Sequence, residues 1–332
     1  MAELDENTGN EDQAPNSAPA PVADGRRRQS LAIKALILLV VFSVGGVGGY
    51  FVGTKLVHQV SAEGNTTPNR DQAMVDMDQV NPPDGYQIPA VFGDIGPKMV
   101  AAGAIDMAKF SGVYKQQNKP LTEAEISILI QGSQDNVLIN PANAYFLLNF
   151  FWAFGLTNQD AILTTGPMVS QGIDKVGSFA STGGWTLGSK SPTDLYASTK
   201  IITLTDEQHA RLLEVASGVY RPCCNNPTHF PDCNHGMAML GLLELMASQD
   251  ATVDEMFQAA KYVTAFWYPQ QMLEVATVFK AAQNLDFDKA DARAMMGGQF
   301  ASISGFQSVH KWLAENGLLQ RAPSSGGSCG VQ

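Results

Sequence analysis

An uninterrupted apolar run near the N-terminus constrains this chain more than any other feature. Residues 31–52 are apolar except for Lys34, Ser43 and several glycines. At 1.5 Å per residue, a helix of this length would extend about 33 Å, which is enough to cross a bilayer. We therefore predict a single-pass transmembrane anchor over residues 31–53, with the lipid bilayer as the first expected partner.

Basic residues lie on one side of this apolar run. Arg26 to Arg28 precede it directly and Lys34 can extend toward the same side, whereas only Lys55 follows closely. The positive-inside rule then places the N-terminus in the cytoplasm and the main domain outside it, in the periplasm or at the cell surface. A cleaved signal peptide is the rival interpretation, because residues 60–62 form a small-residue cleavage pattern. The 30-residue leader and the long apolar core favour the uncleaved anchor.

Three glycines recur every fourth residue within the predicted anchor, at Gly45, Gly49 and Gly53. This spacing places them on one helical face, where a second helix can approach closely. It predicts a homodimer formed through the anchor. Ordinary glycine enrichment in membrane helices is the alternative explanation.

The rest of the chain divides by composition. Residues 1–30 are rich in Pro, Ala, Asn and acidic residues, which predicts a disordered cytoplasmic tail. Residues 54–81 are polar and are interpreted as a stalk. Residues 82–321 are long enough for one large domain. Residues 322–332 form a Ser/Gly-rich flexible tail that carries Cys329.

The formal net charge of -11 excludes a broad nucleic-acid surface, because phosphate binding needs clustered Lys and Arg. The chain has 4 cysteines, too few for a scaffold built mainly on disulfides.

Helical signals dominate the region 82–321, which we expect to be an all-α, multi-helix extracytoplasmic domain. Capping-box pairs start three helices, at Thr122/Glu125, Thr205/Gln208 and Thr252/Glu255. Residues 142–154 are apolar nearly all round and predict the central buried helix. Further helices are expected over residues 98–114, 233–247, 271–283, 288–296 and 304–316. Residues 164–199, rich in Gly, Ser and Thr, predict a loop or hairpin excursion.

The groups that can bind a soft metal are concentrated in one stretch, residues 220–241, with the sequence YRPCCNNPTHFPDCNHGMAMLG. These groups are Cys223, Cys224, Cys233, His229 and His235. Cys224, Cys233 and His235 form the nucleus of the predicted site. Cys223 and the distant Cys329 are the preferred additional ligands, and His229 is held in reserve. A Cys3His set suits tetrahedral zinc, although the spacing differs from the usual CxxC pattern.

Copper is the second choice, because thiolate and thioether ligands select Cu(I). Cys233 and Met237 share one face of the predicted helix, and His235 and Met239 share a different face, so at most one of these pairs can point fully at one metal ion. Met237 and Met239 are therefore better assigned to core packing. An iron–sulfur cluster ranks third, because the cysteine spacing matches no common ferredoxin pattern.

Two interpretations do without a metal. A disulfide between Cys224 and Cys233 and another between Cys223 and Cys329 would make a disulfide-stabilised surface scaffold or interaction protein. Alternatively, Cys233 at a helix N-terminus has a stabilised thiolate, which predicts a thiol redox enzyme centred on it; the neighbouring Asp232 opposes that effect. No hydrolase, P-loop, dinucleotide or zinc-protease motif occurs, so the sequence gives no support for a particular enzymatic reaction.

Overall fold

The structure is a computed structural model that describes residues 69–321. The predicted cytoplasmic tail, the anchor, most of the stalk and the tail with Cys329 lie outside the described residues. Within residues 69–321, no helix combines the length and apolar character that a membrane span requires. The anchor and the homodimer formed through it therefore stay predictions.

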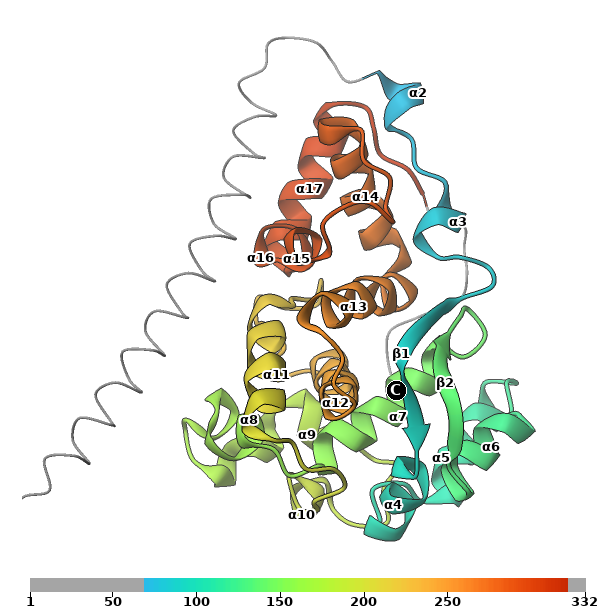
Figure 1. The fold of residues 1–332 in the computed structure, drawn as a ribbon, viewed down its shortest axis with the longest axis vertical. Helices are drawn as coiled ribbons and strands as arrows, with labels where there is room; N and C mark the ends of the chain where they lie inside the picture. The colour runs from blue at the N-terminus through green and yellow to red at the C-terminus, as the bar shows by residue number, and fades with distance from the viewer. Residues whose placement is uncertain (1–68, 322–332) are drawn as a thin grey trace, which may run out of the picture. The chain divides into compact units, whose positions relative to one another are not determined.

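Two buried helices, α7 (Ala144–Thr157) and α12 (Asn234–Ser248), pack against each other at the centre of the described region (Figure 1). Nearly every residue of both helices is buried, which confirms the predicted central helix. The backbones meet at Gly155 and Gly241, where a Cβ atom on Gly155 would overlap the carbonyl oxygen of Met237. Glycine is needed at this contact because any side chain would push the helices apart.

Three capping boxes start helices where the sequence predicts them. In each, the threonine hydroxyl accepts a hydrogen bond from the N3 backbone N–H, and the N3 side chain accepts one from the threonine N–H. They begin α6 (Glu123–Ile130), α11 (Asp206–Gly218) and α13 (Val253–Trp267). Helix α13 ends before Pro269, which occupies the first turn of α14 (Pro269–Gln283).

The C-terminal helices are α15 (Ala292–Met296), α16 (Gly298–Ala301) and α17 (Ile303–Glu315). Helix α15 packs against α13, and α17 packs against α14 and α16. The C-terminal residue of α15, Met296, and the first residue of α17, Ile303, form backbone hydrogen bonds with the loop that carries the cysteines.

A two-stranded antiparallel sheet departs from the all-α expectation. Strand β1 (Tyr86–Gly93) pairs with β2 (Ser133–Ile139), while the rest of the regular structure in the described region is helical. Ile88, Ala90 and Phe92 of β1 point into the core. The strands come from segments far apart in the sequence, so local residue spacing did not reveal their pairing.

The helix expected over residues 98–114 is instead two helices, α4 (Ile95–Ala102) and α5 (Met107–Gln116). Gly103 ends α4 with a left-handed φ of 81°. The Asp106 side chain then accepts hydrogen bonds from the first backbone N–H groups of α5.

The Gly/Ser-rich region 164–199 is compact and contains short helical segments. These are the end of α8 (Ala161–Thr165), η1 (Pro167–Val169), η2 (Ile173–Ser178), α9 (Ala180–Gly183) and α10 (Pro192–Leu195). The region is anchored by Trp185, which is buried and whose Nε1 donates to the carbonyl of Ala104 at 2.8 Å. It packs as part of the domain rather than as an open loop.

The end of the predicted stalk also contacts the helical domain. Residues 69–81 form the short helices α2 (Arg70–Ala73) and α3 (Met77–Val80), both of which pack against α14. The Gln320 side chain accepts a hydrogen bond from the Val75 N–H at 3.1 Å and donates to the Val75 carbonyl at 2.9 Å. The beginning and the end of the described chain therefore lie together.

Candidate metal centre

The cysteines lie on the loop between α11 and α12. Backbone hydrogen bonds connect this loop to α15, to the end of α11 and to α17. The Tyr220 N–H donates to the Met296 carbonyl at 2.9 Å, and the Thr228 N–H donates to Val219 at 2.8 Å. Beyond these, the Ile303 N–H at the start of α17 donates to the carbonyl of Cys224 at 3.0 Å. The loop conformation is thus set by tertiary contacts as well as by its own turns.

The three cysteine sulfurs converge on one point. The Sγ atoms of Cys223, Cys224 and Cys233 all lie within 4.8 Å of one another, and those of Cys223 and Cys233 are 3.3 Å apart. All three are free thiols. In a tetrahedral zinc site with Zn–S bonds near 2.3 Å, neighbouring sulfurs are about 3.8 Å apart. The three sulfurs are therefore close enough together to hold a metal ion.

Cys233 occupies the N-cap position of α12, one residue before the helix begins. Its sulfur accepts a hydrogen bond from the Gly236 N–H at 3.4 Å. Backbone N–H groups and the helix dipole both favour negative charge at this position. The structure therefore places one sulfur where a thiolate is stabilised.

Arg221 is the functional residue that the sequence analysis missed. It is only 3% exposed, and its Nε donates to the Cys233 sulfur at 2.9 Å. Its Nη atoms donate to the carbonyls of Asn226 and Phe230, at 2.9 and 3.0 Å, and to the Asp232 carboxylate. One guanidinium thus links both ends of the loop.

The signal that could have revealed Arg221 is a single cation two residues before a cysteine pair, in a stretch where Asp232 is the only other charged residue. A further constraint comes from Gly236, where a Cβ atom would overlap the guanidinium. The glycine after the second histidine is therefore required for Arg221 to reach the sulfur.

The three thiols differ in the direction of their pKa shifts. Hydrogen bonds from Cys223 and Cys224, with the nearby charge of Arg221, hold the pKa of Cys233 well below its usual range despite burial. Hydrogen bonding to Cys224 and Cys233 raises the pKa of Cys223. For Cys224, hydrogen bonding with Cys223 lowers the pKa, but hydrogen bonding with Cys233 and burial raise it, to about 11. Without a metal, the negative charge resides on Cys233, so an incoming cation must displace protons from the other two thiols.

The two nearby histidines lie outside the three-sulfur group. His235 is 4% exposed and packs against the ring of Tyr268, with centroids 4.6 Å apart, and against Trp267. Burial lowers its pKa to about 4. Burial also lowers the pKa of His229, and within residues 69–321 its Nδ1 atom has no hydrogen-bond partner. Both imidazoles are therefore neutral at pH 7.

The remaining predicted site residues have simpler positions. Met237 and Met239 are buried in the core, as the sequence analysis assigned them. Cys329 lies outside the described residues. Among residues 69–321, the His, Cys, Asp and Glu side chains close enough to share an ion are Cys223, Cys224 and Cys233.

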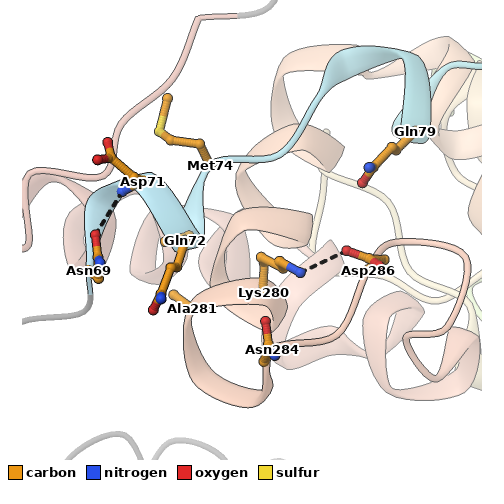
Figure 2. Close-up of a pocket in the computed structure, with 10 residues that line it drawn as sticks. Asn69, Asp71, Gln72, Met74, Gln79, Lys280, Ala281, Asn284 and Asp286 are labelled. Atoms are coloured by element: carbon orange, nitrogen blue, oxygen red, sulfur yellow. Dashed lines mark hydrogen bonds and ion pairs between the residues drawn. The ribbon is translucent and has the colours of Figure 1, made fainter.

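A separate surface groove of about 570 Å³ lies between α2 and the end of α14 (Figure 2). It is lined mainly by polar side chains, and Lys280 within it is paired with Asp286 at 2.8 Å. It shares no lining residue with the cysteine cluster. The groove therefore contributes nothing to the candidate metal centre.

The sequence matches no protein-family model, and no curated protein or solved structure matches it significantly.

Proposed function

We propose that the protein is a membrane-anchored, extracytoplasmic metal-binding protein whose ion is held by the thiolates of Cys223, Cys224 and Cys233. The convergence of their three sulfurs within 4.8 Å carries the metal-binding part of this proposal, and the apolar run over residues 31–53 with the preceding arginines supports the membrane location. Thiolates are soft ligands, which suit zinc and Cu(I) and not magnesium or calcium.

Zinc is the preferred ion and copper the second choice. Three thiolates with Zn²⁺ leave one net negative charge, whereas with Cu⁺ they leave two. Cys233 is half-buried and Arg221 is already paired with Asp232, so uncompensated charge is costly in this loop. Zinc would link the cysteine loop rigidly to α12; copper would indicate carriage, sensing or electron transfer.

A fourth ligand would complete a tetrahedral site. Cys329 is our first candidate, because the eight residues after Arg321 can span at most about 26–29 Å. A tail of this reach brings Cys329 to the cluster wherever Arg321 lies within that distance of the three sulfurs. His235 and His229 are the remaining candidates, and each would need to rotate away from its present position.

Elemental analysis of the full-length protein tests the proposal. After anaerobic, metal-replete purification in detergent, we expect about one zinc or copper ion per chain. Replacing Cys223, Cys224 or Cys233 singly with serine should each remove most of the bound metal. Cys329→Ser should weaken binding only if the tail supplies the fourth thiolate.

The matched control is His310→Gln, which changes a metal-ligating residue type on α17, outside the cluster. It should leave the metal content unchanged. A wild-type protein without stoichiometric zinc, copper or iron would contradict the proposal. If that protein also had no free thiols, the disulfide-stabilised scaffold would replace it.

A further inference from the structure

The sulfurs of Cys223 and Cys233 are in direct contact but differ in their access to solvent. They lie 3.3 Å apart; the Cys223 side chain is exposed, and Cys233 is half-buried beside Arg221. A thiol that faces solvent meets an external oxidant first. A second thiol held against it can complete the exchange without any large movement of the chain.

Cys224 is a poorer partner for either of them. It follows Cys223 directly, and consecutive Cα atoms are about 3.8 Å apart across a trans peptide, which is below the roughly 4.4–6.8 Å usual for a disulfide. Its sulfur lies 3.8 Å from the carbonyl oxygen of Asn226 and from the Asp232 carboxylate. Its own carbonyl is bonded to the Ile303 N–H at 3.0 Å. These contacts hold Cys224 in place while the other pair reacts.

We infer that Cys223 and Cys233 form a reversible disulfide that releases the bound ion, so that the redox state of the surroundings controls metal occupancy. This inference rests on the proposed metal-binding function. To form the bond, the two sulfurs must approach from 3.3 Å to about 2.05 Å. Cys224 would remain as the single thiolate of the cluster and would not retain the ion.

The reaction requires an external disulfide, such as oxidised glutathione, as the electron acceptor. The Cys223 sulfur, which is a thiolate while the ion is bound, attacks one sulfur of that disulfide, breaks its S–S bond and releases one small thiolate. The Cys233 thiolate then attacks the Cys223 sulfur and releases the second small thiolate. The protein loses two electrons, the external disulfide gains them, and the two released thiolates take up protons from water.

The test uses zinc-loaded, full-length protein treated with oxidised glutathione. Released zinc is followed with a chromogenic chelator, and the disulfides are mapped by mass spectrometry without reduction. We expect one zinc released for each Cys223–Cys233 disulfide formed. Dithiothreitol with fresh zinc should restore occupancy.

Two variants that each remove one cysteine of the cluster serve as a matched pair. Cys224→Ser should still form the Cys223–Cys233 disulfide under the same oxidant. Cys223→Ser should form no disulfide within the loop, and oxidant should release its remaining zinc at least ten times more slowly.

Zinc that stays bound while the thiols remain free would overturn the redox inference alone. A disulfide that maps to Cys224 or Cys329 would also overturn it. A wild-type protein that never binds zinc or another metal contradicts the proposed function itself, and the inference with it.

Discussion

Arg221 connects the backbone of the cysteine loop to the chemistry of its sulfurs. Its guanidinium reaches the Cys233 sulfur, two backbone carbonyls and the Asp232 carboxylate at the same time. A planar guanidinium can donate in several directions, whereas an ammonium is a compact point charge. A conservative replacement by lysine therefore cannot reproduce this set of bonds.

We expect Arg221→Lys to lower zinc affinity by about 10- to 100-fold, as the loss of partners that orient metal ligands usually does. Unfolding free energy should fall by roughly 3 kcal/mol, because Asp232 and the loop carbonyls lose buried partners. Competition with a zinc chelator and urea denaturation measure the two effects. Arg293→Lys is the control, since Arg293 forms an exposed pair with Glu214 at 2.9 Å and should change both quantities little. Equal effects in the two variants would show that Arg221 has no special role.

Glu244 is a buried carboxyl group on α12 and is not part of the cysteine cluster. It is fully buried, and its Oε2 accepts a hydrogen bond from the Asn158 side chain at 3.1 Å. Burial, and then the charge of Asp160, raise its pKa well above 4.5. The folded state therefore prefers the neutral acid.

This raised pKa fixes the sign of a pH dependence. The stabilising contribution of neutral Glu244 is complete below the ordinary carboxyl pKa and decreases as pH rises toward the raised value. Glu244→Gln should remove that decrease, so the variant should be at least as stable as wild type at pH 8. Urea titrations between pH 4 and pH 8 measure the free energy of unfolding of the wild type and the variant. Glu255→Gln should have the opposite effect, because hydrogen bonds from Thr252 lower the pKa of Glu255; a parallel response in both variants would contradict the assignment.

At the scale of elements, the contact between α7 and α12 depends on two glycines. Gly155→Ala should lower the free energy of unfolding by about 1–3 kcal/mol, because its Cβ would overlap backbone of α12 that cannot rotate away. Gly112→Ala on α5 is the control: nothing lies within 4 Å of its Cβ position, so alanine should stabilise that helix by about 0.5–1 kcal/mol. Calorimetry on both variants compares them directly. A harmless Gly155→Ala would mean that the helices have room to separate.

Helices that begin with local signals could be predicted from the sequence. The capping boxes at Thr122, Thr205 and Thr252 act within four residues, so their chemistry is visible in a short stretch of sequence. The burial of α7 was equally visible from its apolar surface. Strands β1 and β2 were missed because their partners are distant, and the division between α4 and α5 depended on one left-handed glycine.

The candidate site was predictable to the extent that its residues are neighbours in the sequence. The clustering of Cys223, Cys224 and Cys233 was visible, but the convergence of their sulfurs depends on Arg221 and on contacts with α15 and α17. The position of His235 against Tyr268 could not be predicted, because the aromatic residue comes from the junction of two later helices.

At the scale of the whole molecule, the predicted membrane topology can be tested through the exposure of Cys223. A protein with Cys223 as its single cysteine should react with a membrane-impermeant maleimide in right-side-out vesicles and not in inside-out ones. A protein whose single cysteine is introduced by Asn10→Cys, in the predicted cytoplasmic tail, should show the reverse. Mass spectrometry of the labelled chains reads the result. Labelling of both cysteines from the same side would refute the anchor or its orientation.

The hydrogen bonds between Gln320 and Val75 hold the end of the described chain beside its start, so a circular permutant can test whether this domain packs independently of chain order. A short linker can join the end of the described chain to its start, and new termini can be opened at the exposed turn around Asn118, between α5 and α6. Such a circular permutant would keep the cysteine loop and its supporting helices intact. Because both new termini would lie at the same turn, the permuted domain could also be inserted into a loop of another protein.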